Sequence, residues 1–271
     1  MASGVVKGLL ALISLMTRIP LRGKWDLLSA AKHFYLVPLV GLLTGLVSWG
    51  AALPVTLVLR DAGAGAATYL ITYLLFTGGI HVDGFADYFD ALGAGAQGKA
   101  ALRVLKDPRK GAFAVTAVAT DFILTYALAS HVLATVAGAA TPALTLRAYA
   151  VLAAGHAASA EAMFVSAALG TPEPYEGMGK AFVELSGSLR MVVLNAAVMS
   201  AIAVAYFTTL GPRYVAALAV IAGFSVLASL PVITDAERRL GFVNGDVLGT
   251  THEVGRLAAL LALTALLGVL A

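Results

Sequence analysis

The chain has 271 residues, of which 60% are hydrophobic and 12% are charged, whereas a typical soluble domain carries about a quarter charged residues. It has no cysteine, which excludes disulfide bonds, thiolate metal sites and cysteine nucleophiles. Its formal net charge is only +3, so we expect no nucleic-acid partner. The composition predicts an all-α, polytopic integral membrane helical bundle that forms one domain over residues 1–271.

The hydrophobic stretches predict about seven transmembrane helices, within a range of six to eight, because crossing a bilayer takes roughly 20 apolar residues. An apolar stretch before Thr17, residues 5–16, is too short to cross and predicts an interfacial or re-entrant helix. The predicted spans, in chain order, are 34–59, 65–80, 111–139, 143–169, 191–210, 214–234 and 256–271.

Basic residues are distributed unevenly between the two sides that these spans define. Residues 1–33, 81–110, 170–190 and 235–255 fall on one side. That side holds 15 of the 18 Lys and Arg residues: Lys7, Arg18, Arg22, Lys24, Lys32, Lys99, Arg103, Lys106, Arg109, Lys110, Lys180, Arg190, Arg238, Arg239 and, at its edge, Arg256. The other side holds three: Arg60, Arg147 and Arg213. The positive-inside rule therefore predicts that the long polar loops face the cytoplasm.

Three aspartates follow the second predicted span. Asp83, Asp87 and Asp90 are spaced i, i+4 and i+7, so a helix places them on one stripe. Their charges repel each other unless a cation lies between them, and Mg²⁺ is typically held by one or two carboxylates together with substrate phosphates and water. We therefore predict a metal or phosphate role for the three. The alternative is a solvated acidic turn at the end of a span.

A basic segment follows the aspartates. Arg103, Lys106 and Arg109 could clamp phosphate, Arg by its planar fork and Lys as a point charge. The alternative is that these residues only anchor the chain at the membrane surface. Lys99 and Lys110 fit that alternative best.

Polar groups in other segments complete the candidate site. Lys180 lies in one cytoplasmic segment, and Asn244 and Asp246 lie in another, where Asp246 could complete the metal shell. Arg18, at the end of the short first helix, is either a lipid-phosphate anchor or a substrate contact. Within the predicted spans, Asp121 is costly to bury and indicates a site or a charge pair.

Four sequence blocks, taken in order, resemble the cobalamin synthase family, also called adenosylcobinamide-GDP ribazoletransferase or cobalamin-5′-phosphate synthase. The resemblance covers nearly the whole chain. The blocks are TRIP at 17–20, GGIHVDGFADYFD at 78–90, KDPRKGAF at 106–113 and NGDVLG at 244–249.

This resemblance implies an integral enzyme of the cytoplasmic membrane that joins the two halves of the vitamin B12 nucleotide loop. The 3′-hydroxyl of α-ribazole, or of its 5′-phosphate, attacks the cobinamide-side phosphorus of adenosylcobinamide-GDP, and GMP leaves. Mg²⁺ is the expected cofactor, and the lipid bilayer is the expected surrounding. Whether the enzyme forms a homo-oligomer is left open.

The residue types and the resemblance together give expected roles. Lys106 and Arg109 neutralise phosphate charge. One of the three clustered aspartates accepts the hydroxyl proton, and the expected metal ligands are Asp83, Asp87, Asp90 and Asp246. Substrate contacts are expected from Arg18, His81, Arg103, Lys180, Asn244 and Asp246.

Two other functions compete with this interpretation. A CDP-alcohol phosphotransferase also uses clustered aspartates in a membrane, but its D-G-x-x-D-G-x-x-A-R run is interrupted here, because Tyr88 follows Asp87 and no Ala-Arg pair follows. A cation transporter would explain Asp121 and the aspartate stripe. Its site should lie near the bilayer midplane, whereas the aspartates follow the end of a span.

Overall fold

The computed structural model describes residues 2–23, 25–138 and 141–270, and within these ranges the regular elements are helices, apart from one isolated bridge between Pro172 and Val243. Lys24 and the predicted span ends at residues 139 and 271 lie outside the described residues. The helices are α1 (Ala2–Met16), α2 (Leu27–Lys32), η1 (Phe34–Leu36), α3 (Val37–Leu59), α4 (Ala62–Thr77), α5 (Ile80–Gly93), α6 (Gly98–Leu105), α7 (Ala112–Ala137), α8 (Pro142–Leu169), α9 (Lys180–Ser186), α10 (Leu189–Leu210), α11 (Pro212–Arg239) and α12 (Gly245–Leu270).

The predicted all-α polytopic membrane fold is confirmed, and the described residues hold five or six candidate spans, against a predicted range of six to eight. In the described part of the chain, five helices are long and apolar enough to cross a membrane: Phe34–Leu59, α7, α8, α10 and α11. A sixth is counted if α4 and α5, which meet at 93°, form one broken span. α12 covers the predicted span 256–271 as far as Leu270, and its N-terminal half carries Asp246, Glu253 and Arg256, which make it more polar.

Two consecutive glycines separate α4 from α5. Gly78 and Gly79 have φ values of +66° and +70°, a backbone conformation that glycine adopts without steric cost. The predicted second span therefore ends where the sequence indicated, but the next helix leaves at nearly a right angle. α5 then packs against α12 and α7.

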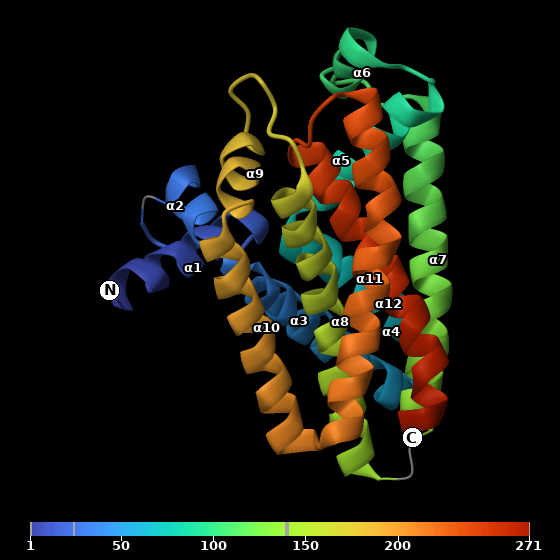
Figure 1. Cartoon of the computed structure of the whole chain (residues 1–271). Helices are drawn as coiled ribbons and strands as arrows, with labels where there is room; N and C mark the ends of the chain where they lie inside the picture. Colours follow the sequence, from blue (N-terminus) through green and yellow to red (C-terminus); the bar gives the residue numbers. More distant parts are fainter. Residues whose placement is uncertain (1, 24, 139–140, 271) are drawn as a thin grey trace.

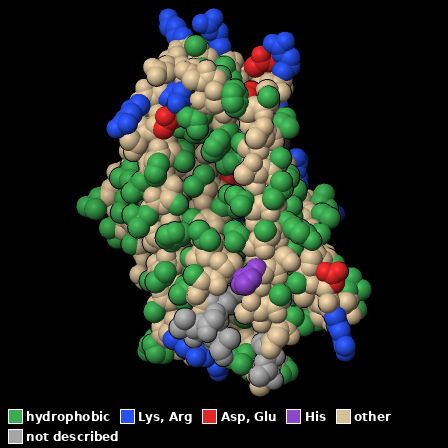
Figure 2. All heavy atoms as spheres, turned by 90° about the vertical axis from the view of Figure 1, so that its right-hand side faces the viewer, with side chains coloured by type: hydrophobic (Ala, Val, Ile, Leu, Met, Phe, Trp, Pro, Cys, Tyr) green, Lys and Arg blue, Asp and Glu red, His purple; other side chains and the backbone are tan. Residues whose placement is uncertain are grey.

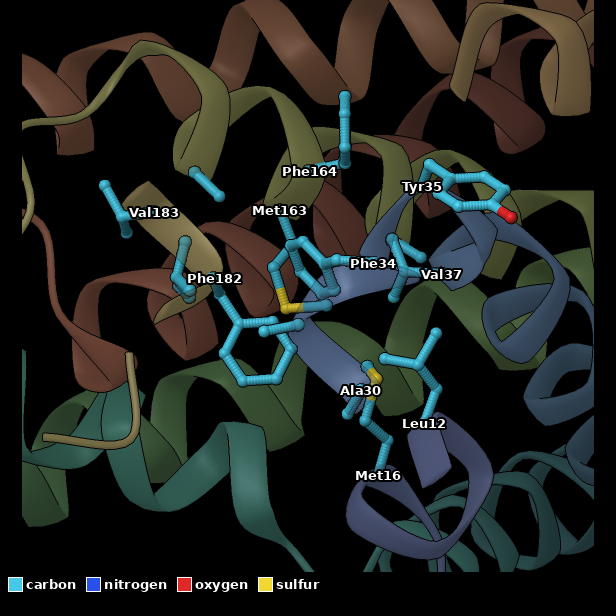
Figure 3. Close-up of a cluster of buried hydrophobic side chains, with 14 of the residues drawn as sticks. Leu12, Met16, Ala30, Phe34, Tyr35, Val37, Met163, Phe164, Phe182 and Val183 are labelled. Atoms are coloured by element: carbon cyan, nitrogen blue, oxygen red, sulfur yellow. The ribbon is translucent and has the colours of Figure 1, made fainter. Parts of the chain in front are cut away.

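The first helix does not run with the bundle. Figure 1 shows α1 lying across the direction of α7, α8, α10, α11 and α12, in agreement with the predicted interfacial or re-entrant helix. Its inner side joins a core with η1, α8 and α9, where Phe34 meets Phe182 edge-on with ring centroids 4.8 Å apart. Figure 3 shows Leu12 and Met16 of α1 facing this core.

The surface of the bundle is apolar along its middle. In Figure 2, hydrophobic side chains cover the central part of the face, and Lys and Arg gather mainly toward its two ends. Large exposed side chains include Leu75, Ile123, Val204 and Leu227, each more than 60% exposed. Such a surface suits lipid, since the backbone groups beneath it are paired within the helices.

Arg256 was predicted to lie at the edge of the cytoplasmic side, and that prediction was wrong. Arg256 is 1% exposed and lies inside the bundle rather than at a loop edge. There it donates hydrogen bonds to Asp121 of α7 and Glu253 of α12. Asp121 thus belongs to a buried charge pair, one of the two outcomes that its position in the sequence indicated.

Candidate active site

Polar segments from different parts of the chain meet at one end of the bundle. Figure 1 shows the connection from α5 through α6 to α7, the connection from α8 to α9 and the connection from α11 to α12 at the same end, opposite the C-terminus. The aspartate stripe on α5 and Asp246 in the first turn of α12 belong to this end. The predicted site residues are therefore gathered by the fold into one region.

A single lysine bridges the first two aspartates. The Nζ atom of Lys110 lies 2.9 Å from an Asp83 carboxylate oxygen and also donates a hydrogen bond to Asp87. The Asp83 side chain is 68% exposed, whereas that of Asp87 is only 12% exposed. Burial opposes the charge of Lys110, but its bonds to Asp87 and Asp83 outweigh burial and raise the pKa of Lys110.

The third aspartate has a different set of partners. Asp90 accepts hydrogen bonds from the backbone N–H of Gly111, at 2.9 Å, and of Ala114, at 3.3 Å. These are N–H groups at the start of α7, which have no partner within that helix. A Cβ at position 111 would collide with the Asp90 carboxylate, so the glycine permits this contact. Asp90 therefore caps α7 and fixes the residue next to Lys110.

Asp83 lies on the wall of two cavities. One cavity, of about 580 Å³, is bordered by α1, α4 and α5 and contains Arg18, Thr17 and Gly79 in its lining. Arg18 packs directly against Gly78, where a Cβ would collide with its guanidinium group. The structure thus brings the predicted cation Arg18 and the carboxylate of Asp83 to one cavity.

The second cavity is mostly apolar and joins Asp83 to Asp246. Phe34, Met163 and Phe182 line it together with His81. The ring of His81 stacks on His252 of α12, with centroids 4.1 Å apart. A largely apolar ligand group that also carries polar atoms is suited to such a lining.

A third cavity lies on the other side of Asp246. Its lining includes Lys106, Tyr175, Asn244 and the buried Glu173. The Lys106 ammonium lies 4.1 Å from the centre of the Tyr175 ring, a cation–π contact. Asn244 donates to Asp246 at 2.9 Å and accepts from the N–H of residue 247, so it orients the aspartate while capping α12.

Glu173 holds the loop that forms a wall of this third cavity. Its carboxylate accepts the backbone N–H of Lys180 at 3.0 Å. Burial raises the pKa of Glu173, although its hydrogen bonds to Tyr175 and to backbone N–H groups act in the opposite direction. Glu173 and Tyr175 were not among the predicted site residues, since neither forms a spaced pattern with other polar residues.

Glycines allow α5 and α12 to approach closely behind these cavities. A Cβ on Gly84 would lie 2.8 Å from the Cα of Asp246, and a Cβ on Gly249 would lie 3.0 Å from the carbonyl oxygen of His81. Small residues permit such backbone contact between helices. The distance between the two carboxylate-bearing helices is thus set by glycine.

Three predicted site residues, Arg103, Arg109 and Lys180, pair with residues that do not belong to the aspartate stripe. Arg109 pairs with Asp107 at 2.8 Å and its side chain is 88% exposed. This contact lowers the pKa of Asp107 to about 2. Arg103 donates to the carbonyl oxygen of Lys99 at 3.4 Å, and the Nζ of Lys180 pairs with Glu176. Lys110, by contrast, was assigned to the membrane anchors, and the structure places it between the aspartates.

The predicted metal shell of Asp83, Asp87, Asp90 and Asp246 is not assembled as a unit. Among the residues that the structure describes, no group of three or more His, Cys, Asp or Glu side chains is arranged to hold a metal ion. Two carboxylates that share one cation are nevertheless present, because Asp83 and Asp87 both contact Lys110. Mg²⁺ needs only one or two protein carboxylates when phosphates and water supply the rest, so this pair fits it.

An apolar helical bundle with carboxylates and cations around cavities at one end suits a polytopic membrane enzyme that acts on phosphorylated groups. The chain matches the model of the cobalamin-5-phosphate synthase family over residues 8–264 and belongs to that family. This membership selects the predicted transferase over the two alternative functions.

Curated relatives agree with this assignment. An adenosylcobinamide-GDP ribazoletransferase of Methanocella arvoryzae is 30% identical, with 96% of each chain covered. Proteins of the same name from Clostridium acetobutylicum and Escherichia coli are 28% and 29% identical, covering 96% and 93% of this chain and 96% and 97% of the relatives. No solved structure matches the chain significantly.

Proposed function

We propose that this protein transfers α-ribazole, or α-ribazole 5′-phosphate, to adenosylcobinamide-GDP and releases GMP. The names of its relatives support this reaction. The observation that carries the proposal is the position of Asp83, an exposed carboxylate shared by a cavity with a cation and a cavity with an apolar lining. A transferase with two substrates needs such a group where the two meet.

The reaction is a displacement at phosphorus. The 3′-oxygen of the ribazole forms a bond to the cobinamide-side phosphorus, and the bond from that phosphorus to the oxygen of GMP breaks. The hydroxyl proton passes to a carboxylate, for which we propose Asp83, since it is more exposed than Asp87. Lys106 neutralises charge on the phosphates from the side of Asp246.

Asp83 and Asp87 would hold the Mg²⁺ ion. When bound, the ion would supply positive charge that offsets the negative charge on the phosphate oxygens and on the leaving GMP oxygen. Asp246 faces the same apolar cavity from α12, where Asn244 orients its carboxylate. We assign Asp246 to contact with substrate, alongside His81 and Arg18.

We place the protein in the cytoplasmic membrane with this site facing the cytoplasm. Most Lys and Arg residues belong to segments on the side of the site, which the positive-inside rule assigns to the cytoplasm. Nucleotide substrates are charged and soluble, so a site on this side receives them directly. Fusing a reporter active only in the cytoplasm to the connection between α6 and α7, and to Arg213, tests the orientation, with activity expected at the first position alone.

The proposed reaction is tested with purified protein in detergent. Release of GMP from adenosylcobinamide-GDP should require both α-ribazole and Mg²⁺, and removing either should stop it. Release that does not depend on α-ribazole would indicate a hydrolase and contradict the proposal. Cation flux in proteoliposomes without any GMP release would favour the transporter alternative.

A further inference from the structure

Lys110 occupies the position at which a metal ion would serve the aspartate pair. Its Nζ contacts Asp83 and Asp87 at the same time, and the lysine side chain is 35% exposed. Lys110 thus supplies the positive charge that two nearby carboxylates need in the absence of any other cation. A divalent cation bound to the same two carboxylates would lie close to this ammonium group, and the two positive charges would repel each other.

The backbone next to Lys110 is held by α5, the helix that also carries Asp83 and Asp87. Asp90 accepts the N–H of Gly111, the residue after Lys110, and of Ala114. The Lys110 side chain therefore extends from a fixed backbone, which keeps its ammonium group near the aspartates. Its neighbour Arg109 has the same charge but points to solvent, where it pairs with Asp107.

We propose that Lys110 is a tethered counter-ion that holds Asp83 and Asp87 when no metal is bound and competes with the metal for them. This inference rests on the metal assignment in the proposed function. Lys110 then sets how tightly the metal binds, and it leaves the two carboxylates when the ion arrives. The three aspartates therefore have different roles. Asp83 and Asp87 bind the cation, and Asp90 positions Lys110.

The size of the effect follows from the population of the bridged state. Apparent affinity falls by the fraction of molecules that are competent to bind, so a bridge present in about nine molecules of ten weakens metal binding about tenfold. Removing the ammonium group should restore that affinity. It should also leave two uncompensated carboxylates, which lowers the melting temperature in metal-free buffer.

Metal binding to the purified full-length protein tests this without reference to catalysis. Mn²⁺ serves as the probe because oxygen ligands accept it as they do Mg²⁺, and its electron paramagnetic resonance signal reports free ion. Lys110→Met should bind Mn²⁺ about tenfold more tightly than the unaltered protein, and Mg²⁺ should displace it. Lys110→Arg, which keeps the charge, should stay within about threefold, and Arg109→Met within about twofold.

Each outcome decides the matter. Tightening confined to Lys110→Met, together with a melting temperature that only this variant recovers on adding metal, supports the inference. Equal affinities in all four proteins, or equal tightening in Arg109→Met, would overturn it. Absence of Mn²⁺ binding to any of the proteins would overturn it along with the metal assignment, while the GMP-release assay judges the transfer reaction separately.

Discussion

Arg256 of α12 donates from one Nη atom to both carboxylate oxygens of Asp121 on α7, at 2.8 and 3.0 Å. The same guanidinium group contacts Glu253 through Nε at 2.8 Å and the hydroxyl of Thr125 through its other Nη atom. Arg256, Asp121 and Glu253 are each buried. This cluster links α7 to α12. Arg256 lies one helical turn after His252, whose ring stacks on His81.

Replacing Arg256 with Met should destabilise the fold strongly. The substitution leaves two carboxylates buried without a cation, and breaking one partner of a buried ion pair typically costs about 3–5 kcal/mol. Thermal unfolding in detergent measures the loss. Arg213→Met is the matched control, because Arg213 is exposed and its side chain donates a hydrogen bond to its neighbour Tyr214, and it should change stability by no more than about 0.5 kcal/mol.

The double variant Arg256→Met/Asp121→Asn should be more stable than the sum of its single variants. Residues in contact couple by about 0.5–3 kcal/mol. Full additivity would show that the pair seen here carries no coupling. Such a result would contradict the role of Arg256 as the link between α7 and α12.

Asp90 should behave differently from its two neighbours in the stripe. Asp90→Ala removes the cap of α7 and should cost about 1 kcal/mol of stability, as loss of a helix N-cap does. Asp83→Asn should leave stability nearly unchanged, because the side chain is exposed. It should abolish transfer, because Asp83 is the proposed acceptor of the hydroxyl proton. Melting curves and GMP release, measured on both variants, separate the roles. Identical behaviour in the two assays would argue against them.

Gly84→Ala should impair transfer by separating α5 from α12. The added methyl group would lie 2.8 Å from the Cα of Asp246, and this backbone atom cannot move away easily. Gly223→Ala in α11 is the matched control, because a Cβ there meets nothing within 4 Å. In a helix that exchange should add about 0.5–1 kcal/mol of stability. Comparable activity in both variants would show that close approach of α5 and α12 does not matter.

Lys106 and Arg109 should differ in their effect on substrate binding. Lys106 lines the cavity next to Asp246, whereas Arg109 is held by Asp107 in solvent. Lys106→Met should raise the KM for adenosylcobinamide-GDP by about tenfold, a loss of about 1.4 kcal/mol. Arg109→Met should change it by less than about threefold. Steady-state kinetics at saturating α-ribazole provide the comparison, and a larger effect at Arg109 would restore its predicted role.

The sequence predicted those parts of the structure that depend on local periodicity. Helices appear where hydrophobic stretches are long, and Asp83, Asp87 and Asp90 share a stripe because helix geometry fixes their spacing. The bend after α4 had a visible signal in Gly78 and Gly79. Its angle had none, since packing against α7 and α12 decides it.

Long-range pairing could not be predicted in the same way. Asp121 and Arg256 are 135 residues apart, so hydropathy placed the arginine at a loop edge although its partner lies inside the bundle. Lys110 resembled any other basic residue near a span, because only the fold shows that its ammonium group reaches two carboxylates. Asp90 was predicted to bind the metal because of its spacing from the other two aspartates. That spacing could not show that its oxygens accept the N–H groups at the start of α7.

The proposed mechanism assigns the transfer reaction to Asp83 and Asp87 at the polar end of the bundle. The most direct measurement is the rate of GMP release by Asp87→Asn, compared with Asp107→Asn, a carboxylate change at an exposed pair in the neighbouring segment. Both variants must first show the melting temperature expected of folded protein. Asp87→Asn should lose at least about a thousandfold in rate, or about 4 kcal/mol, while Asp107→Asn should keep its activity. Normal turnover by folded Asp87→Asn would contradict the mechanism.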